Sequence, residues 1–390
     1  MTINEMSPVV QTASITQLTQ ELVQIPSQGG IDPYPPIVEH LTGWLADAGL
    51  QPDVLTDDDG PVAVTCTVAG SQPGPHLVLD ACLDTAAAGD RDTWDRDPFS
   101  GDIENGWLYG RGSSDSKAAI SLFSHLASEL NEHRNFVGQF SLLFDLDEHT
   151  GGFAGIRRYL QDAPPIDGVM IGYPGTSKIV VGGRGFWRAT IPVHGRSAHT
   201  GSSSTGGVNA IVRATRLAGM LAAVFPTEPD PVLGLPPKLT ITSISGGMPG
   251  SWSVVPDRCE ISIDVRLTPG FTAGAAQSLV GAMCLELDET DPVDVATSVH
   301  RSTETWPAFR LPDDHPLPGR LRAGAVAAGL DPRLAVAGPS NIGCLLADRG
   351  IPATAGFGVG YVGLHAANEA IDLATVPAVY AAYRSAIIGP

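Results

Sequence analysis

The stretch HLVLDACLDTAAAGD (residues 76–90) runs from a mostly apolar segment into a polar loop. This pattern predicts a buried strand that ends near Cys82 and Asp84. Further along, SDSKAAISLFSHLASEL (114–130) has the periodicity of a helix, and GQFSLLFDLDE (138–148) that of a second buried strand. A strand, a helix and another strand in this order predict an α/β fold with a mostly parallel sheet.

The pattern of the chain changes twice along its length. The α/β pattern covers residues 1–180 and returns at 293–390. Between them, stretches such as RCEISIDVRLTPG (258–270) alternate apolar and polar residues, as antiparallel strands with one wet face do. We therefore expect a discontinuous catalytic domain that is interrupted by an α+β domain at 181–292.

Composition excludes several classes of protein. The chain has 390 residues and a formal net charge of −19, which argues against nucleic acid or an anionic membrane as a partner. Its five cysteines include no C-x-x-C pair, so neither a disulfide framework nor a zinc ribbon is expected. Because no secretory leader pattern and no apolar run of membrane-spanning length is visible, we expect a cytoplasmic protein.

Chemically versatile residues gather where the predicted strands end. The carboxyl ends of parallel strands share one edge of a sheet, and ligands bind there. The candidates that we expect at this edge, or in the loops that approach it, are Cys82, Asp84, Asp115, Glu148, His149, Tyr173 and His365.

Four stretches carry a resemblance to a known family. They are WDRDPFSGDIENGWLYGRGSSDSKAAI (94–120), GRSAHTG (195–201), VPDRCEISIDVRLTPG (255–270) and LHAANEAI (364–371). In this order they resemble the metallopeptidases that include aminoacylase, acetylornithine deacetylase, succinyl-diaminopimelate desuccinylase and glutamate carboxypeptidase. The resemblance implies a zinc-exopeptidase-like catalytic domain with an inserted lid and dimerisation domain. It also implies a homodimeric hydrolase of the amide bond in an N-acyl amino acid or small peptide-like substrate.

The resemblance also implies a metal site, with changes. The family binds two zinc ions, and its five ligand positions correspond here to Cys82, Asp115, His149, Tyr173 and His365. Only Asp115 and His365 keep the family's residue type. Asp115, His149 and His365 together offer two imidazoles and a carboxylate, which suits one catalytic zinc. A phenol ionises reluctantly, with a pKa near 10, so we expect one zinc ion or none.

The family match assigns roles to residues near the metal and in the lid. Glu148 corresponds to the general base, and Asp84 to the residue that orients the first ligand. His199 matches a histidine that reaches the partner subunit's active site and stabilises an oxyanion. Arg266 matches an arginine that could clamp a substrate carboxylate, although a strand residue paired across the sheet is the alternative.

Other positions depart from the family pattern. Ser253 stands where the family has an asparagine, and Asn341 belongs to a changed pair near a late helix. With Tyr173, they predict an altered substrate pocket. Cys82 has three interpretations, as a buried structural residue, a metal ligand or a nucleophile, and the sequence leaves all three open.

The changed ligand positions leave a second function open. A metal-independent enzyme on the same scaffold could condense, cyclise, isomerise or cleave an amino-acid-derived intermediate in a specialised biosynthetic pathway. A non-catalytic binding protein is the third hypothesis, and the retained Glu148 argues against it.

Overall fold

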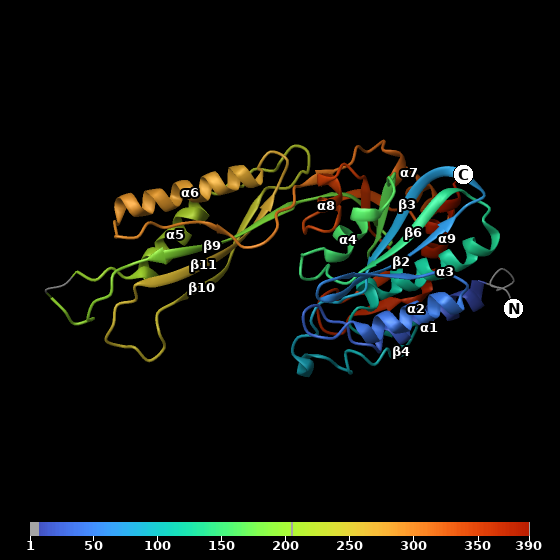
Figure 1. The fold of residues 1–390 in the computed structure, drawn as a ribbon, viewed down its shortest axis with the longest axis horizontal. Coiled ribbons are helices and arrows are strands. Elements are labelled where there is room, and N and C mark those ends of the chain that lie inside the picture. Colours follow the sequence, from blue (N-terminus) through green and yellow to red (C-terminus); the bar gives the residue numbers. More distant parts are fainter. Residues whose placement is uncertain (1–7, 204–205, 390) are drawn as a thin grey trace. The chain divides into compact units, whose positions relative to one another are not determined.

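A computed structural model describes residues 8–203 and 206–389, and Figure 1 shows its fold. The chain divides into two compact units. The first unit contains the residues up to Val181 together with Leu311–Ala337 and Asn341–Pro390. The second contains Gly182–Arg310 and Gly338–Ser340, so in sequence it is an insertion within the first.

The first unit is built around a sheet whose central strands are parallel. The strand order is β1 (Asp53–Asp57), β2 (Gly60–Ala69), β6 (Val137–Asp145), β3 (Gln72–Cys82), β7 (Gly168–Gly172), β15 (Ala353–Phe357) and β8 (Lys178–Gly183), with β14 (Arg333–Ala337) also paired to β8. β6, β3, β7 and β15 run parallel, while β1, β2 and β8 join antiparallel. Every residue of β3 from His76 to Cys82 is buried, as a central parallel strand requires. The predicted α/β fold is confirmed.

Helices surround this sheet in Figure 1. They are α1 (Pro8–Val23), α2 (Pro35–Asp47), α3 (Ala118–His133), α4 (Ala154–Asp162), α7 (Pro316–Ala327), α8 (Gly343–Asp348) and α9 (Val376–Ile388). The helix predicted from residue 114 begins only at Ala118, because Asp115 has non-helical dihedral angles (φ −123°, ψ 87°). Asp115 is therefore not an acidic residue in the first turn of α3. Within the described residues, no helix has both the length and the apolar character that a membrane crossing requires.

A small antiparallel sheet joins two distant parts of the first unit. Its strands, in order, are β16 (Gly360–Val362), β17 (Ala370–Asp372), β5 (Trp107–Tyr109) and β4 (Ile103–Glu104). β4 and β5 lie between β3 and α3 in the sequence. β5 pairs with β17, and the Gly110 amide donates to the Glu369 carbonyl at 2.8 Å. This sheet therefore places the residues around 110–115 beside those around 365–369.

The second unit has its own antiparallel sheet. Its strand order is β10 (Lys238–Gly246), β11 (Arg258–Leu267), β9 (Gly185–His194) and β12 (His300–Arg301), and its helices are α5 (Ala210–Val224) and α6 (Ala273–Thr290). Alternate residues of β11 are buried against both helices, as the apolar–polar alternation predicted. The second unit extends past the expected end at 292, because β12 pairs with β9 and β13 (Phe309–Arg310) pairs with Gly182 and Gly183.

Candidate active site

The ends of β3 and β6 bring four candidate residues to one edge of the first unit's sheet. Cys82 ends β3 and is in register with Asp145, the last residue of β6. Asp84 accepts hydrogen bonds from the backbone amides of Glu148 (3.2 Å) and His149 (3.0 Å). The segment after β3 therefore fixes the segment after β6 through this buried carboxylate.

Asp115 lies at the centre of the cluster and is only 2% exposed. Its Oδ2 lies 2.7 Å from Nε2 of His365, and its Oδ1 accepts from Ser116 Oγ at 2.9 Å and from the Cys82 thiol at 3.2 Å. Burial alone would raise the pKa of Asp115, but the imidazoles of His149 and His365 outweigh burial and lower it. Asp115 is therefore an ionised carboxylate that faces two histidines.

A buried ion pair holds Asp115 in place. Arg111 Nη1 donates to Glu369, and both side chains are almost fully enclosed. The same Glu369 carboxylate accepts from Ser114 (backbone amide 2.9 Å, hydroxyl 2.7 Å) and from the Asp115 amide at 3.3 Å. The Arg111 guanidinium lies 5.3 Å from the ring centroid of Trp94. This network connects two signature motifs, and the sequence analysis did not include Arg111 or Glu369 among the site residues.

His149 is the buried histidine of the cluster, with its side chain 8% exposed. Its Nδ1 lies 3.3 Å from Asp84 and its Nε2 lies 3.5 Å from Asp115. Neither ring nitrogen makes a hydrogen bond of good geometry. Burial would lower the pKa of His149, but the two carboxylates raise it to about 11. The ring nitrogens of His149 are therefore buried without a hydrogen-bond partner. A metal cation bound between His149 and the neighbouring carboxylates would provide such a partner.

Two overlapping groups of side chains could hold a metal ion. The ligand atoms of Asp115, His149 and His365 all lie within 4.8 Å of one another, and so do those of Cys82, Glu148 and His149. Two imidazoles and a carboxylate form a donor set of the kind found in catalytic zinc sites. The first group therefore fits a zinc ion, and the poorly partnered nitrogens of His149 support that fit.

Glu148 lies beside this donor set, with its Oε2 3.8 Å from Nδ1 of His149. Its side chain is 21% exposed. Burial raises the pKa of Glu148, and repulsion by the carboxylates of Asp115 and Asp84 raises it further. Attraction to His149 offsets only part of this rise, so the pKa is about 8. Glu148 can therefore gain and lose a proton near neutral pH, as a general base must.

Cys82 is a buried thiol. Its Sγ contacts the carboxylate of Asp115 at 3.2 Å and the hydroxyl of Ser116 at 3.3 Å. Burial, followed by the negative charges of Asp115 and Glu148, raises the pKa of Cys82 well above its ordinary value. A reactive thiolate needs a lowered pKa, and the pKa of Cys82 is raised. The geometry therefore disfavours the nucleophile interpretation.

Tyr173 and Asn341 belong to the same unit but differ in their settings. Tyr173 follows β7, and burial and the charges of Asp115 and Glu148 raise the pKa of its phenol. A neutral phenol can donate a hydrogen bond but is a poor zinc ligand. Asn341 lies two residues before α8, and its side-chain oxygen accepts from the Gly343 amide at 2.8 Å.

The remaining candidates lie in the second unit. His199 is exposed, and its Nδ1 accepts from the Gly201 amide at 3.0 Å. Ser253 is exposed on the neighbouring segment, and its carbonyl accepts from the Thr200 amide at 2.9 Å. Arg266 contacts Asp264 at 2.7 Å, so it is paired within its own strand and not across the sheet.

Sequence comparison finds relatives that cover most of the chain. A model described as Peptidase family M20/M25/M40 matches residues 79–388. Succinyl-diaminopimelate desuccinylase of Xanthomonas oryzae pv. oryzae (strain MAFF 311018) is 27% identical over 329 residues, which cover 80% of this chain and 83% of the relative. The protein of the same name from Rhodospirillum centenum (strain ATCC 51521 / SW) is 28% identical over 329 residues, covering 80% and 81%.

Solved structures share the fold. The metallo-carboxypeptidase Sso-CP2 from Sulfolobus solfataricus matches with a TM-score of 0.79 and 17% identity, covering 96% of this chain and 98% of that one. A tripeptidase from Staphylococcus aureus subsp. aureus mu50 matches with a TM-score of 0.75 and 20% identity, covering 96% and 97%. At these identities the likeness establishes the architecture alone.

Proposed function

The chain belongs to peptidase family M20/M25/M40, and on that premise we propose that it hydrolyses the amide bond of an N-acyl amino acid or a small peptide-like substrate. The observation that carries the proposal is the donor set of Asp115, His149 and His365 beside Glu148. Desuccinylases among the relatives support hydrolysis over other reactions.

The metal of the proposed site would be a single zinc ion. Asp115, His149 and His365 would hold it, and when bound it would polarise the amide carbonyl as a Lewis acid. The second donor group is weaker, because Cys82 is a protonated thiol and shares His149 with the first group. The neutral phenol of Tyr173 adds no anionic ligand.

Glu148 would transfer the proton. With a pKa of about 8, its carboxylate can accept a proton from the attacking water and return it to the leaving amine. Asp84 would position this base, because it binds the backbone amides of Glu148 and His149. Asp84 would also orient the imidazole of His149. The family residue at the position of Asp84 orients the first metal ligand, but that ligand position holds Cys82 here, which has no ring nitrogen.

Five further residues would contact the substrate. Arg266 would bind a substrate carboxylate, and His199 would stabilise the tetrahedral oxyanion, as the family resemblance implies. Tyr173, Ser253 and Asn341 would contact other parts of the substrate. This assignment of the five residues is a proposal from the resemblance, and mutation of each residue with separate KM and kcat measurements tests it.

A metal-independent reaction is the second candidate. The observation that favours it is that Asp115 binds His365, Ser116 and Cys82 directly, so the cluster is hydrogen-bonded through its own side chains. Glu148 would then serve as acid and base, with Cys82 and Tyr173 as neutral donors, in condensation, cyclisation, isomerisation or cleavage of an amino-acid-derived intermediate.

Metal content distinguishes the two candidates. The full-length protein would be purified without added metal or chelator and analysed by elemental mass spectrometry, together with the Asp115→Ala variant. About one zinc per wild-type chain, lost in Asp115→Ala along with hydrolysis of N-acyl amino acids, would support the hydrolase. A wild-type chain that binds no zinc even when zinc is offered would favour the metal-independent reaction.

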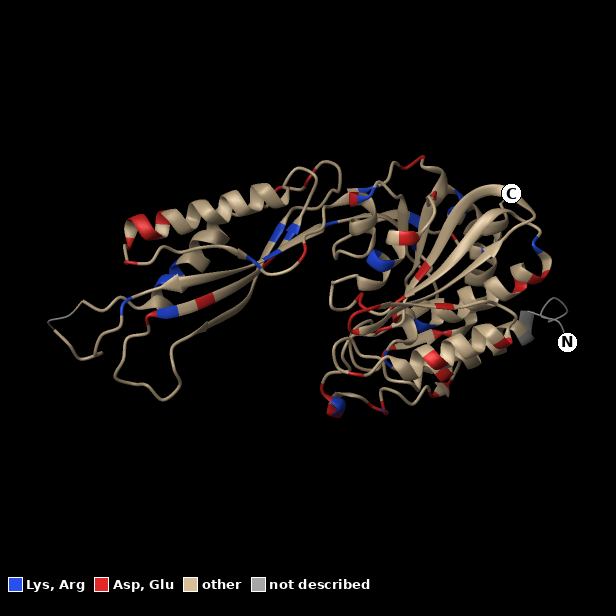
Figure 2. Cartoon of the chain, viewed as in Figure 1, with Lys and Arg blue, Asp and Glu red and all other residues tan. Residues whose placement is uncertain are grey.

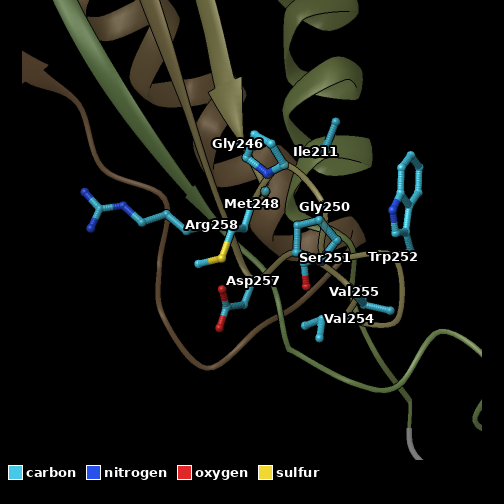
Figure 3. A pocket seen from close by; sticks show the side chains of 13 residues that line it. Ile211, Gly246, Met248, Gly250, Ser251, Trp252, Val254, Val255, Asp257 and Arg258 are labelled. Atoms are coloured by element: carbon cyan, nitrogen blue, oxygen red, sulfur yellow. The ribbon is translucent and has the colours of Figure 1, made fainter.

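The second unit would also form a homodimer. β10 is an edge strand whose outer backbone groups can pair with another strand. Beside its end, residues 246–252 and 254–258 with Ile211 line a cavity of about 680 Å³, and Figure 3 shows its side chains. Met248 and Trp252 on this segment are 77% and 90% exposed. Large apolar side chains beside an open strand fit a two-fold interface between identical chains.

Light scattering after size exclusion tests the dimer. Trp252→Asp is expected to shift the molecular mass from two chains to one. Leu285→Asp is the matched control, because Leu285 is also an exposed apolar residue but lies on α6. A wild-type protein of one-chain mass would refute the dimer.

A further inference from the structure

The loop that carries Glu148 begins and ends at one buried carboxylate. This loop covers residues 146–153 and connects β6 to α4. Asp145, the last residue of β6, is fully buried. Its Oδ1 accepts from the Asp147 amide at 2.7 Å, and its Oδ2 accepts from the Ile156 amide at 2.7 Å. One side chain therefore closes the loop at both ends. Figure 2 shows acidic residues among the loops of the first unit.

The start of α4 depends on this carboxylate. The first amides of a helix have no partner within the helix, so an acceptor from outside must bind them. Phe153 occupies the N-cap position, and its aromatic side chain has no atom that can accept these hydrogen bonds. Asp145 accepts from Ile156 in the first turn instead. Asp147 accepts from the Ala154 amide at 3.2 Å. The start of α4 is therefore held by the strand end that precedes the loop.

A glycine makes room for this contact. Gly155 lies in the first turn of α4, where most other residues would be better helix formers. A Cβ at this position would lie 2.7 Å from Asp145 Oδ2 and 2.5 Å from the Val62 carbonyl oxygen. Both distances are too short for a carbon atom. The start of α4 can therefore approach the carboxylate because Gly155 has no side chain.

We propose that Asp145 is a positioning residue that closes this loop and so holds Glu148 and His149 in a catalytic geometry. Asp84 binds the amides of these two residues in the middle of the loop, whereas Asp145 binds amides at its two ends. A displacement of about 1 Å at a catalytic group can reduce a rate by about 10²-fold. The catalytic part of this inference rests on the proposed hydrolase, whereas closure of the loop is a property of the chain itself.

Asp80 provides a matched control. It is also fully buried, and it lies on β3 opposite Leu143, two residues before Asp145 on β6. Partner residues of paired strands point to the same side of a sheet, so the two carboxyl groups share a face. Neither oxygen of Asp80 has a hydrogen-bond partner among the described residues. Burial, with repulsion by Asp145 and Glu148, raises the pKa of Asp80 well above its ordinary value, so asparagine is a neutral replacement of the same shape.

Hydrogen exchange of the full-length protein measures closure of the loop. Amide exchange in peptides that span residues 146–156 is followed by mass spectrometry. Asp145→Asn keeps one acceptor oxygen but places an NH₂ group where the other oxygen accepts. We expect exchange in this segment to be about tenfold faster in Asp145→Asn, the factor that about 1.4 kcal/mol of lost protection produces. Exchange should be faster still in Asp145→Ala and unchanged in Asp80→Asn. Equal exchange in the wild-type protein and Asp145→Asn overturns the proposal.

Kinetics separates positioning from a purely structural role. Values of kcat and KM for N-acyl amino acids are compared at the plateau of each pH profile, so a shifted pKa of Glu148 does not enter the comparison. Asp145→Asn should lower kcat by about ten- to a hundredfold with KM unchanged, and Asp80→Asn should change neither. Faster exchange with an unchanged kcat in an active enzyme overturns the positioning role. A lower kcat without faster exchange also overturns it, because Asp145 would then act through its charge and not through closure.

The two measurements also distinguish this inference from the hydrolase proposal. Circular dichroism verifies folding, and if Asp145→Ala does not fold, Asp145→Asn, which has the same shape as the wild-type residue, decides. If the wild-type protein hydrolyses no N-acyl amino acid but Asp145→Asn loosens the loop and Asp80→Asn does not, the hydrolase proposal fails and closure by Asp145 stands. If the wild-type protein is active and Asp145→Asn changes neither exchange nor kcat, the reverse holds.

Discussion

Replacing Glu369 by alanine would leave the Arg111 guanidinium buried without its carboxylate. The two side chains are 0% and 2% exposed, so water cannot take the place of the lost partner. Removing one member of a buried ion pair costs about 3–5 kcal/mol. The Ser114 amide and hydroxyl would lose their acceptor as well, at about 1–3 kcal/mol for each donor left unsatisfied. We therefore expect Glu369→Ala to lower the free energy of unfolding by at least about 5 kcal/mol.

Urea unfolding followed by tryptophan fluorescence measures this loss. Glu104→Ala is the matched control, because Glu104 also pairs with an arginine, Arg96, at 2.9 Å but is exposed. An exposed pair of this kind contributes about 0–1 kcal/mol. Glu369→Gln should fall between the two variants, since its amide oxygen can still accept from Ser114 but carries no charge for Arg111.

The same substitution should weaken metal binding, because Glu369 also accepts from the backbone amide of Asp115. Zinc affinity would be measured by competition with a chromophoric chelator in the absence of urea, after circular dichroism has verified that both proteins are folded. If Glu369→Ala destabilised the protein no more than Glu104→Ala and left zinc affinity unchanged, the role that we assign to the Arg111–Glu369 pair would be refuted.

Three further substitutions test the site and the core. Glu148→Gln should lower kcat by about 10²–10⁴-fold, the usual contribution of a general base, with zinc content unchanged; equal loss of both would mean that Glu148 is a ligand. His149→Asn should reduce zinc content, whereas His315→Asn, a control at the start of α7, should not. His125 is buried, and burial lowers its pKa from 6.5 to about 4. Between pH 6.5 and pH 4 the unfolded chain therefore binds more protons at this histidine than the folded chain does. The contribution of His125 to the free energy of unfolding should fall by about 3 kcal/mol as the pH drops from 6.5 to 4. His125→Gln should remove that part of the pH dependence of unfolding.

The central strands could be predicted because their residues report their environment. The part of β3 from residue 76 to 82 is buried on both faces and is apolar apart from His76 and Asp80, while β11 has one polar face and alternates. The edge that collects Cys82, Asp84, Glu148 and His149 follows from the ends of two such strands. Patterning of this kind depends on burial, so it works best for long, well-packed elements.

The parts that escaped prediction depend on pairing between distant segments. β5 and β17 have three residues each, too few to show a periodicity, and each exists through its pairing with the other. The helical start expected at residue 114 was wrong by one turn, because the Ser114 and Asp115 amides bind Glu369 instead of continuing the helix. The contact between Asp84 and His149 also could not be predicted from local sequence, because the two residues follow different strands, β3 and β6.

The sheet order has a consequence for how the protein is made. β15 lies between β7 and β8 in the first unit's sheet, yet it is synthesised only after the whole second unit. In the nascent chain, the position of β15 between β7 and β8 is therefore still empty while the second unit folds on its own. His365 is synthesised later still, so the donor set that it forms with Asp115 and His149 is complete only near the end of translation. A partly made chain therefore lacks the complete group of candidate metal ligands.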